Sequence, residues 1–130
     1  MSKKYKHKIK VYYEDTDSGG VVYYANYLKF LERARTEMLN SENLSNTKLL
    51  KENKIFIIVK SCNINFMKPA KLEDELEVIS HIKTVTKTSF IMHQSILKKN
   101  EMISDAEVHL VIVNEQGKPT KFPNSLRSII

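Results

Sequence analysis

Residues 24–39, YANYLKFLERARTEML, are the stretch from which the fold can be predicted. Apolar side chains recur there at helical spacing, and charged or polar side chains occupy much of the opposite side. Asn40 follows as a suitable carboxyl-terminal cap. The pattern predicts one long helix with a wide buried stripe. The stripe consists of Tyr24, Tyr27, Leu31, Ala34 and Met38, joined on its flanks by Leu28, Phe30 and Leu39.

Stretches with the character of β-strands surround this helix. Residues 8–13 precede it, and a shorter helix is predicted over residues 46–54, with Ser45 as its amino cap. Polar joints at Lys87 and Asn100 fit hairpin turns. Strands in succession predict an antiparallel sheet whose apolar face the long helix can cover, so we expect an α+β fold. The later predicted strands, rich in β-branched and aromatic residues, are 55–67, 75–85, 89–97 and 102–113.

Length and composition indicate an ordinary globular protein. The chain has 130 residues, of which 42% are hydrophobic and 28% charged, so we expect one domain over residues 1–130. The longest strongly apolar run, residues 55–59, is too short to cross a bilayer, and the amino end lacks the apolar core of a signal peptide. Cys62 is the only cysteine, which excludes an internal disulfide. A cytoplasmic location is therefore expected.

The net charge of +6 raises the question of an anionic partner. Nucleic acid, an anionic membrane surface and a phosphorylated ligand all attract lysine and arginine. Lysines are spread through nearly every segment apart from a cluster at residues 3–8, which favours a dispersed, solvated surface. The sequence contains neither a zinc finger nor an RNP-type motif, so we expect no nucleic-acid partner.

Acidic and turn-forming residues come directly before the long helix, as EDTDSGG at residues 14–20. They fit an ordinary turn, because Gly19 and Gly20 permit positive φ angles and the other residues favour turns. A cation site is a second interpretation, since Asp15 and Asp17 would share one face if strand geometry persisted. No second acidic motif completes the octahedral oxygen set that magnesium needs, so we expect no metal.

A third interpretation of residues 14–20 is catalytic. The amino terminus of a helix carries unpaired N–H groups and a positive dipole end, where an oxyanion can be stabilised. Hydrolysis of an ester or thioester needs such donors together with a base or nucleophile near the carbonyl carbon. Other nucleophiles fit less well: there is no Gly-x-Ser-x-Gly elbow, and Cys62, in a predicted strand, is expected to be buried and structural. The four histidines are widely scattered.

The same residues carry a family resemblance. YEDTDSGGVVYYANY at residues 13–27, continuing as LKFLERAR at residues 28–35, resembles the signature of the YbgC and 4-hydroxybenzoyl-CoA thioesterases. Ser61, Cys62 and Asn63 resemble the family's next strand, so the similarity covers most of the chain. The resemblance implies the hotdog fold, an antiparallel sheet wrapped around one long central helix, in agreement with the α+β architecture predicted from the pattern.

The resemblance also implies an activity and its residues. Asp17 matches the family's catalytic carboxylate, acting as nucleophile or as general base toward water, and Asp15 matches its structural neighbour. The backbone N–H of Tyr24 matches the group that polarises the thioester oxygen. Lys87 falls where related enzymes carry a basic residue near the phosphates of coenzyme A. Family members form dimers that associate into tetramers with active sites between subunits, so a homo-oligomer, a homotetramer in the fullest case, is expected.

These observations predict an acyl-CoA thioesterase that releases a carboxylic acid and free coenzyme A. No cofactor is expected beyond the coenzyme A that the substrate itself carries. Two alternatives remain open at this point. One is hydrolysis of acyl-carrier-protein thioesters, which present the same carbonyl on a pantetheine arm. The other is a non-catalytic hotdog module that binds acyl-CoA.

Overall fold

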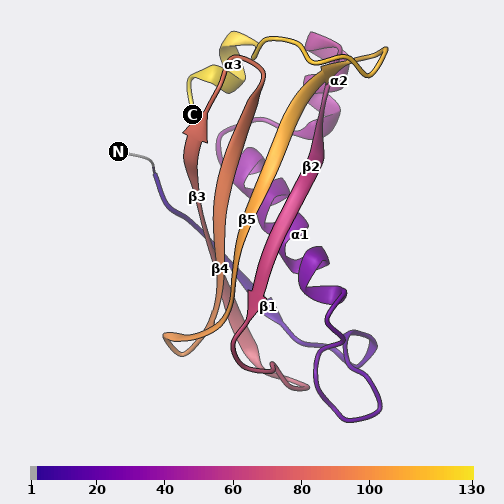
Figure 1. Cartoon of the computed structure of the whole chain (residues 1–130), viewed down its shortest axis with the longest axis vertical. Helices are drawn as coiled ribbons and strands as arrows, with labels where there is room; N and C mark the ends of the chain where they lie inside the picture. The colour runs from indigo at the N-terminus through magenta and orange to yellow at the C-terminus, as the bar shows by residue number, and fades with distance from the viewer. Residues whose placement is uncertain (1–2) are drawn as a thin grey trace.

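The computed structural model describes residues 3–130, and it confirms the α+β hotdog architecture. One antiparallel sheet in the strand order β1-β3-β4-β5-β2 curves around the long helix α1 (Figure 1). Two short helices lie near one end of the sheet, and a 3-10 turn, η1, precedes α1. The elements are β1 Tyr5–Lys10, η1 Tyr13–Asp15, α1 Asn26–Ser41, α2 Asn46–Asn53, β2 Ile55–Phe66, β3 Glu75–Val85, β4 Ser89–Lys98, β5 Glu101–Asn114 and α3 Asn124–Arg127.

Helix α1 forms because its apolar residues fall on one side and can be buried against the sheet. Phe30 has none of its surface exposed, and Leu31 has 1%. Tyr24, predicted for the stripe, precedes the helix and is 64% exposed, and Leu28, predicted for its flank, is 47% exposed. The helix ends at Ser41, one residue beyond the predicted cap, and Glu42 caps it. The buried positions are Tyr27, Phe30, Leu31, Ala34, Met38 and Leu39.

The central strands alternate as a sheet covered on one face requires. In β3, Leu76, Val78 and Ser80 are buried, whereas the residues between them are partly exposed. Successive side chains of a strand point to opposite faces, so one face of the sheet meets α1 and the other meets solvent. Ser45 caps α2 as predicted, because its hydroxyl accepts a hydrogen bond from the backbone N–H of Lys48 at 3.0 Å.

The first strand lies earlier than predicted. It was expected over residues 8–13, but β1 covers Tyr5–Lys10 and pairs with β3. Beyond Val11 the chain turns into η1, because the buried carboxylate of Asp15 accepts a hydrogen bond from the backbone N–H of Tyr12 at 2.9 Å. A local side-chain acceptor therefore ends the strand before the β-forming tyrosines can extend it.

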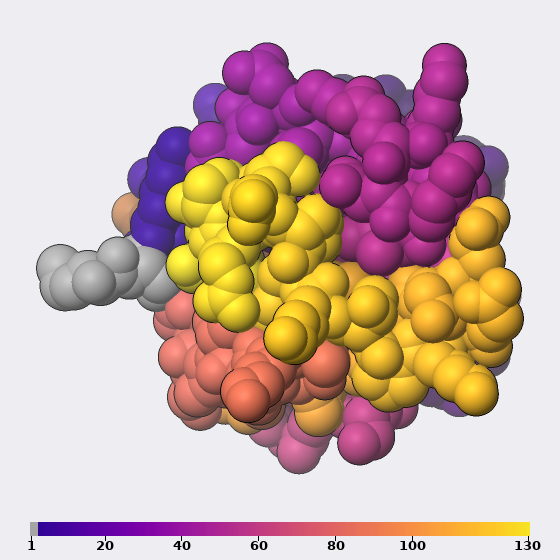
Figure 2. Space-filling model, turned by 90° about the horizontal axis from the view of Figure 1, so that it is seen from above, coloured from indigo at the N-terminus to yellow at the C-terminus, as the bar shows by residue number. Residues whose placement is uncertain are grey.

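The carboxyl-terminal segment closes one end of the core. Phe122 and Leu126 are buried there, and the ring of Phe122 packs on Phe90 with centroids 6.0 Å apart. Figure 2 shows this end from above, with the segment in yellow between α2 and the β3–β4 hairpin. The core is thus sealed at the end opposite the loop that joins β1 to α1 (Figure 1).

Strand β2 is a sheet edge that the helices leave largely uncovered. It pairs only with β5, and Val59 and Phe66 are about half exposed at 49% and 48%. Cys62 was predicted to be buried and structural, but it is exposed on this strand. The error has a physical reason: burial in a strand depends on whether another layer covers it, and local sequence does not carry that information.

The packing of α1 can be tested by truncating its most buried aromatic side chain. We expect Phe30→Ala to lower the free energy of unfolding by about 3–5 kcal/mol, because the change leaves a cavity between helix and sheet. Lys29→Ala, on the exposed side of the same turn, should change it by less than about 0.5 kcal/mol. Urea denaturation monitored by circular dichroism measures both, and equal effects would contradict the predicted orientation of the helix.

Candidate functional site

The loop between β1 and α1 folds back on itself as a tight hairpin. The backbone N–H of Asp17 donates to the carbonyl of Val21 at 2.9 Å, and Thr16 forms a β-bridge with Val22. Gly19 and Gly20 form the tip. Gly20 has a φ of 81°, a left-handed conformation that residues with a Cβ adopt at a cost. The two glycines therefore allow the turn that returns the chain toward α1.

Asp15 fastens this hairpin to the beginning of the helix. Its carboxylate is buried and accepts from Tyr12, as described above, and its backbone carbonyl accepts from two groups near the helix start. These donors are the backbone N–H of Tyr23 at 3.0 Å and the side-chain amide of Asn26 at 2.9 Å. The arrangement agrees with a structural role for Asp15.

Asp17 is exposed, and its carboxylate is held in one orientation. Its Oδ1 accepts a hydrogen bond from the backbone N–H of Gly19 at 2.8 Å, which leaves the other oxygen free for solvent or substrate. A Cβ at Gly19 would stand 3.3 Å from that Oδ1, so glycine also gives the carboxylate its space. Asp15 is buried and Asp17 is exposed, so the two do not share a face as the magnesium interpretation required. Within residues 3–130, no three side chains of metal-binding type are grouped to hold an ion.

The helix α1 begins at Asn26, two residues later than predicted, and its first three backbone N–H groups donate to the carbonyls of residues 23–25. An unpaired backbone donor lies just before it, close to this loop. In the described chain the N–H of Tyr24 donates to no protein acceptor, and Ala25 at the cap provides no side-chain hydrogen bond. The positive dipole end of a helix favours a negatively charged oxygen nearby. The short return from Asp17 to Tyr24 therefore brings a carboxylate and an unpaired backbone N–H to one region.

Aromatic rings border the helix start on the side of β2. The ring of Phe66 lies 5.3 Å from that of Tyr27 and 6.5 Å from that of Tyr24, between centroids. The ring of Tyr27 is held in place because its hydroxyl accepts a hydrogen bond from the backbone N–H of Ala70 at 3.0 Å. Sequence analysis missed Phe66 as a site residue. No local signal could have found it, since its approach to the helix depends on the pairing of β2 with β5.

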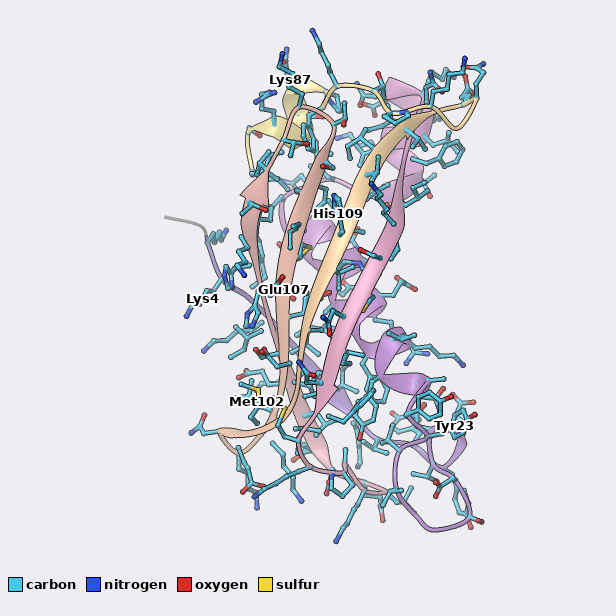
Figure 3. All side chains as sticks on the ribbon, in the orientation of Figure 1. Lys4, Tyr23, Lys87, Met102, Glu107 and His109 are labelled. Carbon is cyan, nitrogen blue, oxygen red and sulfur yellow. The ribbon has the colours of Figure 1, made fainter. Side chains whose placement is uncertain are left out.

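Lys87 does not lie near Asp17 in the same chain. It is exposed in the turn between β3 and β4, whereas the Asp17 loop is bonded to the connection that leads into β3. Strand β3 has 11 residues, and at about 3.3 Å per residue it separates the two by roughly 35 Å. Figure 3 shows Lys87 at one end of the molecule and Tyr23, beside the loop, at the other.

Comparisons with known proteins agree with this fold. A family model described as the thioesterase-like superfamily matches residues 11–130. The acyl-CoA thioester hydrolase YbgC of Escherichia coli is 40% identical over 120 residues, which cover 91% of this chain and 89% of that protein. The chain belongs to this thioesterase family. It is accordingly a thioester hydrolase of the YbgC type.

Two further relatives support the family assignment. The acyl-CoA thioesterase YbgC of Haemophilus influenzae is 39% identical over 121 residues, covering 92% of this chain and 89% of its own. The crystal structure of a probable thioesterase from Bartonella henselae is 35% identical with a TM-score of 0.90, and the match covers 93% of this chain and all of that one. In the part of the chain that the structure describes, no helix has the length and apolar character to cross a bilayer.

The two glycines with positive φ allow a matched test of whether the Asp17 hairpin takes part in thioester hydrolysis. Gly20 and Gly117 have φ values of 81° and 79°, and a Cβ at either would meet no atom within 4 Å. We expect Gly20→Ala and Gly117→Ala each to lower the free energy of unfolding by about 1–2 kcal/mol through backbone strain. Only Gly20→Ala should also slow thiol release, because only that strain acts on the Asp17 hairpin. Equal catalytic rates in the two variants would show that the Asp17 hairpin does not take part in the reaction.

Proposed function

We propose that the protein hydrolyses acyl-CoA thioesters with Asp17 as the reacting carboxylate and the backbone N–H of Tyr24 as the donor to the carbonyl oxygen. The observation that supports this most is the short hairpin that brings an oriented, exposed carboxylate close to the unpaired backbone N–H of Tyr24, just before α1. The names of the relatives point to the same substrate class. Coenzyme A belongs to the substrate, and the proposal needs no separate cofactor.

The proposed reaction replaces a C–S bond with a C–O bond. As a general base, Asp17 takes a proton from water while the water oxygen attacks the carbonyl carbon, and the oxyanion that forms accepts a hydrogen bond from Tyr24 N–H. Collapse of this intermediate breaks the C–S bond, and the proton passes to the departing thiolate. As a nucleophile, Asp17 would instead form an anhydride that water then hydrolyses. Both routes release a carboxylic acid and free coenzyme A.

Replacing the carboxylate tests the first step. We expect Asp17→Asn to lower kcat by about 100-fold or more, because a base or nucleophile is lost while the side-chain oxygen can still accept from Gly19. Glu14→Gln, at an exposed neighbouring acid, is the control and should retain the wild-type rate. Thiol release from aliphatic and aromatic acyl-CoA substrates measures both. Full turnover by a folded Asp17→Asn protein would disprove the proposal.

We also propose that Lys87 serves the active site of a neighbouring copy in a homo-oligomer. Lys87 and the Asp17 loop lie beyond opposite ends of β3, so a single molecule of acyl-CoA would reach both more readily across two subunits. The uncovered edge of β2 offers a surface for a second copy. We propose a dimer that associates into a tetramer, acting in the reducing environment of the cytoplasm, where an exposed Cys62 stays a thiol.

Charge reversal tests the role of Lys87. We expect Lys87→Glu to raise KM for acyl-CoA several-fold, more so at low salt, with little change in kcat, because the phosphates are bound equally in ground and transition states. Lys99→Glu, in the hairpin at the other end of the sheet, is the matched control and should leave KM unchanged. Steady-state kinetics at two salt concentrations measures KM and kcat for both variants.

Complementation distinguishes a shared site from a site within one chain. Hybrid oligomers of Asp17→Asn and Lys87→Glu chains contain sites in which one subunit supplies an intact Asp17 and its neighbour an intact Lys87. Co-expressed chains should therefore recover activity with the wild-type KM. Hybrids that show only the KM of the Lys87→Glu protein would place both residues' effects within one chain.

A further inference from the structure

A cavity of about 170 Å³ lies beside α1, between this helix, the first residue of α2 and strands β2, β4 and β5. Most of its lining is apolar, including Ile57, Phe90 and Leu110, and its charged lining residues are Glu32 and Arg35. An apolar cavity with few polar groups is typical of a small-molecule site.

Arg35 is held in this cavity by a buried glutamine. Its Nη1 donates to Oε1 of Gln94 at 3.0 Å, and Gln94 is completely buried. The Nε2 of Gln94 donates to the carbonyl of Leu31 at 3.1 Å and to the hydroxyl of Ser80 at 3.0 Å. Because both donors of the amide are used in this way, its oxygen must face Arg35. One hydrogen bond from the sheet therefore holds the guanidinium beside Gln94.

The positive charge of Arg35 has no ionic partner within residues 3–130. The ion pairs of the described chain do not include it, and only one of its five N–H donors is accounted for. Glu32 lines the same cavity, but it is exposed and its carboxylate accepts from the Thr36 hydroxyl at 2.6 Å. Burial lowers the pKa of Arg35, and Glu32 partly offsets this. An arginine nonetheless keeps its charge, and a partly buried charge without a partner is costly.

The guanidinium lies within reach of an acyl group bound at the helix start. Gln94 contacts both Arg35 and the carbonyl of Leu31, so the guanidinium is near the level of Leu31. Leu31 follows Tyr24 by seven positions in the sequence, which is roughly 10 Å at 1.5 Å per residue. Side chains on a helix lean toward its amino terminus, which agrees with this placement. A medium-length acyl chain spans such a distance.

We propose that this cavity binds the far end of the acyl group, and that Arg35 pairs there with a terminal carboxylate of the substrate. The preferred substrates would then be coenzyme A monothioesters of medium-length dicarboxylic acids. This inference rests on the proposed acyl-CoA hydrolysis and specifies its substrate class. A guanidinium suits a carboxylate because its planar donors form two parallel hydrogen bonds. The apolar lining suits the methylene chain between the two carboxyl carbons.

Two substrates of equal length test the inference. Suberoyl-CoA and octanoyl-CoA differ only in the terminal carboxylate, so the ratio of their kcat/KM values reports its recognition. We expect the wild type to favour suberoyl-CoA, and Arg35→Met to lower kcat/KM for suberoyl-CoA by about 10- to 100-fold, the range for a lost hydrogen bond to a charged group. Octanoyl-CoA should change little. Arg33→Met, an exposed arginine on the same helix, is the matched control and should leave the ratio unchanged.

Binding measurements separate a failure of this inference from a failure of the proposed hydrolysis. Calorimetry on Asp17→Asn protein, with and without Arg35→Met, gives dissociation constants for both substrates without depending on turnover. Tighter binding of suberoyl-CoA that is lost with Arg35→Met would support the inference even if hydrolysis were absent. Equal binding of the two substrates by the parent, or an equal loss of both in Arg35→Met, would overturn it. Light scattering on Arg35→Met would show whether such an equal loss comes from a broken subunit interface.

Discussion

Burial of the apolar side of α1 on the concave face of the sheet is the interaction on which the rest of the structure depends. Phe30 and Leu31 are nearly inaccessible, and so are Val78 and Met92 on the facing strands. Each such side chain contributes about 1.5–3 kcal/mol when removed from water. Because this packing fixes the direction and rotation of the helix, it also decides where the helix begins and which residues its flanks present to solvent.

The candidate site depends on the fixed position of the beginning of α1. Asp15 joins the hairpin to the first residues of α1, and further backbone bonds join the hairpin to the connection before β3, from Val22 to Ala70 and from Leu72 to Gly20. The exposed Asp17 therefore stands on a loop held from two sides. A carboxylate oriented in this way has little conformational freedom left to lose when a ligand binds, as the proposed attack on a thioester carbonyl requires.

Uneven covering of the sheet leaves the molecule a second open surface, beside β2. Helix α1 packs against β1 and β3, while β2 remains an edge whose residues are mostly exposed. The same asymmetry leaves the cavity beside Arg35 and an exposed edge to which we propose that a second copy binds. Gln94, on β4 in the middle of the sheet, joins the helix to this cavity. Its amide donates a hydrogen bond to the backbone of α1 and accepts one from the guanidinium of Arg35.

The sequence by itself determined the elements whose patterns are local. The stripe of α1, the strands from Ile55 onward and the Asp-Gly-helix signature could be predicted, as could the fold family, because periodicity and motif are properties of neighbouring residues. Tertiary structure alone decided the end of β1, the exposure of Cys62, the approach of Phe66 to the helix start and the buried contact of Gln94 with Arg35. Each of these depends on which layer covers a strand or which distant side chain supplies a partner, and those contacts exist only once the chain has folded.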